Sequence, residues 1–199
     1  MRIGIPLFLV SSIVFGQQKL IDDRDGNEYQ IVKLENIYWM KENLRYEAEG
    51  SLCFDNCSEI RFYDFNYLKG VCPKGWRLPI MHEWDSFAQS FSDSETARMM
   101  EGNKKLYRVD FLNQYNIFET NVLNIQPYGR VEGGTLGTGN FIDFWTVNLS
   151  TKDQRFHMHI TPYSIVGHGH KHHLKASKPD EFRLFPIRCV CEAGKVEGK

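Results

Sequence analysis

Hydrophobic and polar residues alternate along several stretches of the chain with the two-residue period of a half-buried β-strand. Residues 154–160, "QRFHMHI", show this period most clearly, because one face is apolar and the other is basic. The apolar face consists of Phe156, Met158 and Ile160, and the basic face of Arg155, His157 and His159. We therefore predict a strand here that buries its apolar face.

Further strands are predicted near both ends of the chain. Residues 29–34 form a strand after the Asp-Gly turn at Asp25 and Gly26, and residues 36–44, "NIYWMKENL", form its hairpin partner. Later strands are expected within residues 122–131, 141–149 and 183–191.

The central region has a helical period instead. Apolar residues recur there at the i, i+3, i+4 and i+7 spacing, as Trp84, Phe87, Ala88 and Phe91. This spacing predicts a helix over residues 81–91, and residues 94–102, "SETARMMEG", predict a second one. Residues 104–121 give a poor signal and are expected to form a loop with short pieces of structure.

The order of these elements indicates the fold class. Strands on both sides of two short helices, without a β-α-β rhythm, predict an α+β fold of mostly antiparallel strands. The chain has 199 residues, of which 42% are hydrophobic, and this is enough for one well-cored domain. Its formal net charge is -1 and it has no stripe of Lys and Arg, which argues against a nucleic-acid partner.

A rigid segment precedes the first predicted helix. Residues 72–79 read "CPKGWRLP", and Pro73 and Pro79 forbid helix through this piece. The residue before each proline is pushed toward extended geometry. We therefore predict a fixed, non-repetitive lead-in that aims the helix.

The N-terminus has the features of a secretory signal peptide. Arg2 is a minimal basic region, residues 3–14 form an apolar run, and Gly16 is a small residue before the expected cleavage. The run is shorter than the about 20 residues that span a bilayer. We predict a signal peptide over residues 1–16 and a single domain over residues 17–199, with no membrane span after processing. The mature chain is expected to be secreted, periplasmic or at the cell surface.

Export makes disulfides the expected state of most of the five cysteines. Cys53 and Cys57 enclose a short loop and can bridge locally. Cys72 is then left for Cys189 or Cys191, which point to the same face of a strand. We favour Cys189 as its partner, and Cys191 is then either free or used between chains.

Several motifs occur in the order found in a known family. They are "DRDGNEYQIVKLENIYWMKENL", "GVCPKGWRLPIMHEW", "YGRVEGG", "FWTVNL" and a terminal "IRCV". Over residues 21–190 the chain thereby resembles the Fibrobacter succinogenes major paralogous domain family, which is similar to a branch of the C-type-lectin-like fold. The resemblance implies this disulfide-stabilised fold and supports the pairing of Cys72 with Cys189, but it implies no activity. The segment "FWTVNL" departs from the family pattern, because it is more apolar and lacks an acidic residue.

Histidines form the main cluster of potential metal ligands. Two lie on the basic face of residues 154–160 and four lie close together before the last strand: His157, His159, His168, His170, His172 and His173. Neutral imidazoles at this spacing can bind Zn²⁺ or Cu²⁺, so a metal-handling protein is one hypothesis. The alternatives are adventitious metal affinity of a flexible, solvated turn that contains Gly167 and Gly169, and a turn that becomes cationic at low pH.

A second set of residues suggests a carbohydrate platform. It combines aromatic rings with polar groups that can bind hydroxyls, and its members are Tyr128, Trp145, Asn148 and Arg155. Trp145 lies in an apolar run, and its alternative place is the core. The Glu-Pro-Asn and Trp-Asn-Asp triplets of calcium-dependent lectins are not intact, so the resemblance does not extend to calcium-dependent sugar binding.

Catalysis is not expected from the motifs. The sequence has no Gly-x-Ser-x-Gly elbow, His-Glu-x-x-His helix or phosphate-binding glycine loop. A remote alternative is an enzyme related to the formylglycine-generating enzymes, which share a lectin-like fold and use cysteines, with Cys191 as the residue of interest. The main hypothesis is a lectin-like binding or adhesion module for glycan or protein ligands.

Overall fold

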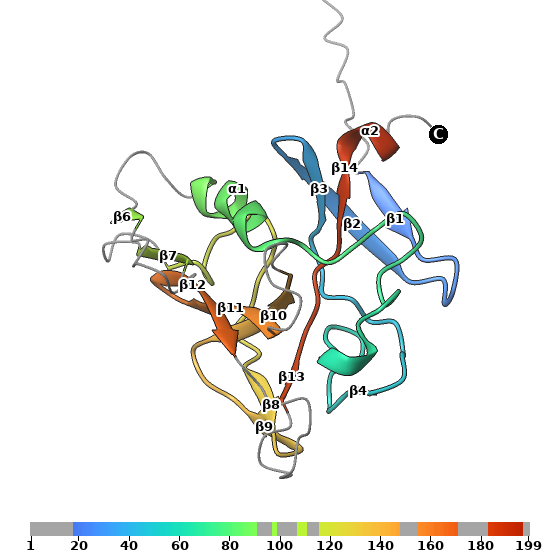
Figure 1. Ribbon diagram of the computed structural model, residues 1–199. Helices are drawn as coiled ribbons and strands as arrows, with labels where there is room; N and C mark the ends of the chain where they lie inside the picture. The colour runs from blue at the N-terminus through green and yellow to red at the C-terminus, as the bar shows by residue number, and fades with distance from the viewer. Residues whose placement is uncertain are drawn as a thin grey trace, which may run out of the picture.

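Antiparallel β-sheets with few short helices make up the described part of the chain (Figure 1). The computed structural model describes residues 18–90, 97–98, 107–110, 116–147, 155–170 and 183–196. The predicted signal peptide lies outside these ranges. Strand pairing gives one sheet of four strands and two sheets of five. The mostly antiparallel character of the predicted class is therefore confirmed.

The first sheet joins the two ends of the described chain. Its order is β1 (Lys19–Ile21), β2 (Glu28–Leu34), β3 (Ile37–Met40) and β14 (Val190–Glu192). β2 and β3 form the predicted hairpin, with Val32 opposite Trp39, and on its other side Trp39 is opposite Val190. Figure 1 shows the red β14 beside the blue β3, so strands from both ends of the sequence share one sheet.

The second sheet contains a strand that the sequence pattern misses. Its order is β10 (Ile142–Thr146), β11 (Arg155–Thr161), β12 (Ser164–His170), β7 (Tyr107–Asp110) and β6 (Ala97–Arg98). β11 is the predicted strand and buries Phe156, Met158 and Ile160, but His157 on its other face is buried as well, at 4% exposed. Residues 168–170, assigned above to a flexible turn, instead continue β12. Strand β11 pairs along the whole of β12, and β7 pairs with residues 164–167 from the other side, so backbone hydrogen bonds hold β12 extended.

The second predicted helix, residues 94–102, is wrong where the structure describes it. Ala97–Arg98 form β6, which pairs with β7. β7 itself lies within residues 104–121, where only a loop with short pieces of structure is expected. Pairing with β7, the next strand along the chain, satisfies the backbone of β6, and this pairing overrides a short helical pattern.

The third sheet combines strands from the early, middle and late parts of the chain. Its order is β4 (Ser51–Leu52), β5 (Phe62–Asp64), β13 (Arg183–Phe185), β8 (Arg130–Glu132) and β9 (Thr135–Gly137). The predicted strand 183–191 is thus two strands, because Pro186 has no N–H group to continue the β13 ladder. In Figure 1 the red segment between β13 and β14 runs through the middle of the molecule.

The helices are short. They are η1 (Phe65–Tyr67), η2 (Met81–Glu83), α1 (Trp84–Gln89) and α2 (Ala193–Val196), where η marks a 3₁₀ turn. The helix predicted over residues 81–91 therefore begins as a 3₁₀ turn and continues as α1. Trp84 and Phe87 are fully buried, and the Trp84 ring lies 5.0 Å from that of Trp39. Among the described residues, no helix is long and apolar enough to cross a membrane.

The lead-in 72–79 is fixed against the last strand. A disulfide joins Cys72 to Cys189. The Arg77 N–H donates to the Val190 carbonyl at 2.9 Å, and the Val190 N–H donates back at 2.8 Å. The lead-in is therefore held by one covalent bond and a two-way bridge, directly before η2.

The cysteines pair as the sequence analysis favours. Besides Cys72 and Cys189, a disulfide joins Cys53 to Cys57, while Cys191 is free and buried. Structural disulfides persist in oxidising compartments. The two bonds therefore indicate an extracytoplasmic environment.

Candidate functional site

A cavity of about 400 Å³ with polar walls lies beside the loop that follows β3. Its walls come from four segments that are far apart in the sequence. They contribute Glu42, Asn43 and Arg45, then Ser58 and Glu59, then Asn124, Gln126 and Tyr128, and finally Arg188. We call this cavity the polar pocket. Glu42 and Asn43 belong to the "WMKENL" motif and Arg188 to "IRCV".

The wall that carries Tyr128 is a loop fixed by the side chain of Asn121. The Asn121 amide group donates to the carbonyls of Ile117 and Ile125 at 2.8 and 3.0 Å, and its oxygen accepts from the Ile125 N–H at 2.7 Å. Asn124 has a φ of 51°, a left-handed conformation that Asn adopts more readily than most residues. The side chain of Asn121 thus closes the turn and sets the position of the wall.

Arg188 lies under the pocket and ties two of its walls together. Its side chain is fully buried, and its Nε donates to the Asn43 Oδ1 at 2.9 Å. Its terminal nitrogens donate to backbone carbonyls of both walls, those of Met40, Lys41, Leu123 and Asn124. Burial lowers the pKa of Arg188, but a guanidinium with this set of acceptors stays charged at neutral pH.

Tyr128 and Glu59 meet at the rim of the pocket. The Tyr128 hydroxyl donates to the Glu59 Oε2, and the Glu59 carbonyl accepts from the Asn43 side chain at 3.2 Å. Burial, together with the Glu59 carboxylate, raises the pKa of Tyr128 to about 12. The phenol is therefore a neutral hydrogen-bond donor at physiological pH.

Glu42 and Arg45 complete the wall next to β2. The Glu42 Oε2 accepts from the Gln30 N–H at 2.8 Å. The Arg45 guanidinium donates to the Glu28 carbonyl at 2.8 Å and lies 4.5 Å from the centre of the Tyr29 ring. Both contacts hold the Arg45 cation against β2 instead of pairing it with Glu42.

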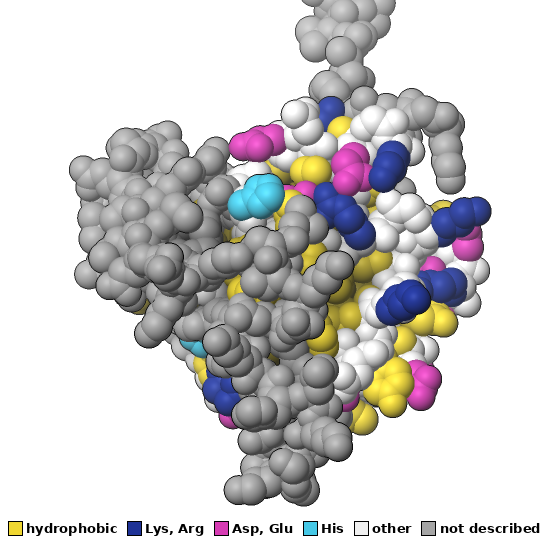
Figure 2. All heavy atoms as spheres, in the orientation of Figure 1, with side chains coloured by type: hydrophobic (Ala, Val, Ile, Leu, Met, Phe, Trp, Pro, Cys, Tyr) yellow, Lys and Arg dark blue, Asp and Glu magenta, His cyan; other side chains and the backbone are white. Residues whose placement is uncertain are grey.

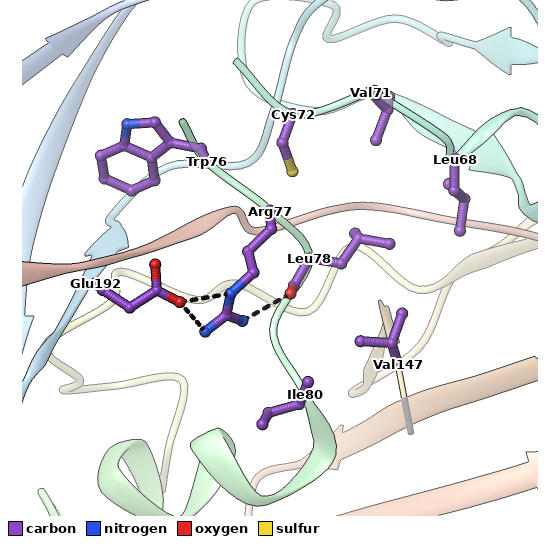
Figure 3. A pocket seen from close by; sticks show the side chains of 10 residues that line it. Leu68, Val71, Cys72, Trp76, Arg77, Leu78, Ile80, Val147 and Glu192 are labelled. Carbon is purple, nitrogen blue, oxygen red and sulfur yellow. Dashed lines mark hydrogen bonds and ion pairs between the residues drawn. The ribbon is translucent and has the colours of Figure 1, made fainter. Parts of the chain in front are cut away.

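A second cavity, of about 490 Å³, lies along the lead-in (Figure 3). We call it the apolar pocket, because most of the side chains that line it are hydrophobic: Leu68, Val71, Cys72, Trp76, Leu78, Ile80 and Val147. In the space-filling view, hydrophobic side chains are visible toward the middle and right of the face, with charged side chains of both signs beside them (Figure 2).

The charged groups at the apolar pocket form ion pairs with one another. Arg77 donates to both carboxylate oxygens of Glu83, at 2.6 and 2.8 Å, and to Glu192 at 3.0 Å. Figure 3 shows the Arg77 guanidinium turned toward Glu192. Bonds from Lys195 and Arg77 lower the pKa of Glu192 to about 2. The Glu83 carboxylate also accepts from the Ile80 N–H at 2.8 Å, so this cluster fixes the entry to η2.

Two of the predicted metal ligands surround a buried carboxylate. The fully buried Asp143 accepts a hydrogen bond from the His159 Nδ1 at 2.7 Å and one from Arg130 at 3.1 Å, and the His157 Nε2 lies 3.6 Å away. Burial alone would raise the pKa of Asp143, but its contacts with His159, His157 and Arg130 lower it overall. The side chains of His157 and His159 are therefore engaged with Asp143.

The other histidines are described only in part. Register places His168 opposite His157 and His170 opposite Arg155, while His172 and His173 lie outside the described residues. Within the described ranges, no three His, Cys, Asp or Glu side chains are grouped so that they could hold a metal ion. Metal binding by the histidine-rich segment stays a prediction.

The predicted carbohydrate platform is not gathered in one place by the described residues. Tyr128 lines the polar pocket. Trp145 is 3% exposed, donates to the Tyr63 carbonyl at 2.6 Å and lies 4.3 Å from the Phe185 ring, so the structure supports its alternative place in the core. Arg155 is on β11, with only its backbone described, and Asn148 is outside the described residues.

The sequence analysis does not single out the other polar-pocket residues. One signal was available, since Arg188 is a lone cation in the apolar run "LFPIRCVC", which is typical of a buried charge with dedicated acceptors. Glu42 and Asn43 stand in the motif "WMKENL", which the sequence analysis uses only for the predicted family resemblance. Nothing in the sequence pattern indicates that these residues meet Glu59.

Cys191 has no environment that would activate it. It lies on β14 with 2% of its surface exposed, and burial raises the pKa of its thiol. A reactive cysteine needs a lowered pKa and access to substrate. The geometry therefore gives no support to the remote enzymatic alternative.

Comparisons with protein-family models, curated proteins and solved structures found no match to this chain. The resemblance to the Fibrobacter succinogenes major paralogous domain family thus stays a prediction. Function has to be argued from the two pockets.

Proposed function

We propose that the protein is a lectin-like binding module, secreted, periplasmic or at the cell surface, that holds a glycan in the polar pocket without catalysis. The observation that carries this proposal is the pocket, a cavity of about 400 Å³ walled by carboxylates, amides and a phenol. Small-molecule sites occupy about 300 to 1,000 Å³, and convergent polar groups fix the orientation of the ligand. A polyhydroxylated ligand fits walls with this many hydrogen-bonding groups.

Rigid walls support a binding role. Arg188 joins Asn43 to the loop that contains Asn124, and the Cys53–Cys57 disulfide closes the loop directly before Ser58. Side chains and loops that are already ordered lose little entropy when a ligand binds. The polar pocket therefore has the preorganisation that weak, hydroxyl-rich ligands require.

The protonation of Tyr128 favours binding over nucleophilic catalysis. A tyrosine nucleophile must lose its proton, and the pKa of about 12 keeps Tyr128 protonated at physiological pH. Its hydroxyl can instead share its lone pairs with a ligand hydroxyl while it donates to Glu59.

A glycan array tests the proposal. The protein, produced from the full-length chain in an exporting host, is applied to neutral, amino and acidic oligosaccharides with and without zinc. We expect zinc-independent binding that Tyr128→Phe weakens and that Tyr163→Phe, at an exposed tyrosine outside the pocket, leaves unchanged. Binding to no glycan, or binding indifferent to Tyr128→Phe, would overturn the proposal. Binding that requires zinc would favour the metal-handling hypothesis.

A further inference from the structure

We propose that the polar pocket selects glycans that carry protonated amino groups, so that its ligands are oligomers of amino sugars without N-acetyl groups. This inference rests on the glycan-binding function proposed above and assigns Glu42 and Glu59 as the residues that determine specificity.

The two carboxylates are only partly used by the protein. One oxygen of Glu42 accepts from the Gln30 N–H, and one oxygen of Glu59 accepts from the Tyr128 hydroxyl. Both donors are neutral. Within the described residues neither carboxylate belongs to an ion pair, although both line the cavity. Each carboxylate therefore keeps hydrogen-bond accepting capacity for a ligand.

The hydrogen-bond donors of the two cations of the pocket are used elsewhere, although the charge of Arg188 still attracts the Glu42 carboxylate. Arg188 is fully buried and donates to Asn43 and to backbone carbonyls, and Arg45 is held against the Glu28 carbonyl and the Tyr29 ring. The walls contain two carboxylates and two guanidinium groups, so their formal charges cancel. The guanidinium donors are already used within the protein, whereas the carboxylates can still accept hydrogen bonds from a ligand. A ligand in the cavity meets carboxylate oxygens more readily than guanidinium donors.

A protonated amine matches this arrangement. An ammonium group has three donors and no acceptor, and its hydrogen bonds to carboxylates are charge-assisted. N-acetylation removes the charge and leaves only ordinary amide donation. A uronic acid brings a third carboxylate to Glu42 and Glu59, and like charges at a binding site oppose association.

Isothermal titration calorimetry with three matched ligands tests the selection. They are the tetrasaccharides of glucosamine, N-acetylglucosamine and galacturonic acid, measured at a pH where the glucosamine amines are protonated. We expect the glucosamine tetramer to bind at least about fivefold more tightly than the acetylated one, as for a partly exposed charge pair. No binding of the galacturonate tetramer is expected.

Substitutions locate the selection in the pocket. Glu42→Gln and Glu59→Gln keep an acceptor for the Gln30 N–H and the Tyr128 hydroxyl but remove the charge. Each should bring the affinity ratio of the two glucosamine ligands toward one while the acetylated tetramer still binds. Glu49→Gln, at an exposed glutamate outside the pocket, should leave the ratio unchanged.

The outcomes separate this inference from the function on which it rests. Equal binding of both glucosamine ligands, or a ratio unaffected by the two substitutions, would overturn the selection and leave glycan binding intact. Tighter binding of tri-lysine than of the glucosamine tetramer would overturn the assignment to amino sugars. If no sugar in this series or on the array binds, both proposals fail.

Discussion

The two pockets differ in which groups accept hydrogen bonds from an arginine in their walls, Arg77 in the apolar pocket and Arg188 in the polar pocket. In the apolar pocket Arg77 binds the carboxylates of Glu83 and Glu192. In the polar pocket Arg188 binds backbone carbonyls and Asn43 instead. The carboxylates of the apolar pocket therefore hold the lead-in in place, whereas those of the polar pocket remain available to a ligand. A carboxylate that is paired with an arginine stabilises the fold, whereas an unpaired one can bind a ligand.

The largest expected effect is on stability and concerns the disulfide that lines the apolar pocket. Replacing both Cys72 and Cys189 by Ser opens a bond across 117 positions of the sequence. The chain-entropy relation for a loop of this length gives a loss of about 4 to 5 kcal/mol in the free energy of unfolding. Denaturant unfolding followed by tryptophan fluorescence measures the loss.

The short disulfide beside the polar pocket is the matched control. Cys53 and Cys57 are separated by four positions, so replacing both by Ser should cost only about 2 kcal/mol by the same relation. The freed loop would no longer hold Ser58 and Glu59 in place, and glycan affinity should fall. A greater loss of stability than in the Cys72 and Cys189 double variant would contradict the account, in which the long disulfide stabilises the fold and the short one mainly positions the polar pocket.

Replacing the two arginines compares the pockets directly. Arg188→Met leaves several buried carbonyls without a donor and should lower the free energy of unfolding by about 3 kcal/mol. Arg77→Met should cost about 1 to 2 kcal/mol, because Glu83 keeps the Ile80 N–H and Glu192 keeps Lys195. Thermal unfolding of both variants checks the order, and the reverse order would contradict the account.

The smallest expected effect is the dependence of stability on the protonation of Glu192, at the apolar pocket. The pKa of Glu192 is lowered in the folded chain to about 2, so the charged form is favoured by folding. Its contribution is complete above the usual value of 4.5 and is lost as the pH falls toward 2. NMR titration of the Glu192 carboxyl should show this midpoint, and Lys195→Ala should raise it. A midpoint near 4.5 in the unchanged chain would contradict the network.

Local patterns in the sequence predict the parts of the fold that depend on burial of one face. The alternation of Phe156, Met158 and Ile160 indicates β11, and the spacing of Trp84 and Phe87 indicates α1. β6 and β12 are missed because their local patterns resemble a helix and a glycine-containing turn. Pairing with β7 and β11 decides their structure, and the hydrophobic period of a short segment does not indicate which strand it will pair with.

The candidate site is predicted less completely than the fold. Tyr128 is named from the sequence, but as part of a platform with Trp145, which the structure places in the core. The polar pocket depends on four segments that come together only after folding. Arg188 could have been singled out as a lone cation among apolar residues, whereas Glu42 and Glu59 carry no signal of their proximity.

The most direct test of the central claim is to map where a glycan binds. Amide chemical shifts of the isotope-labelled protein are followed as the glucosamine tetramer is added. The account predicts changes centred on residues 42–45, 58–59 and 124–128, with little effect on residues 68–80 around the apolar pocket. Changes centred on residues 68–80, or no changes at concentrations far above those that bind typical lectins, would contradict it.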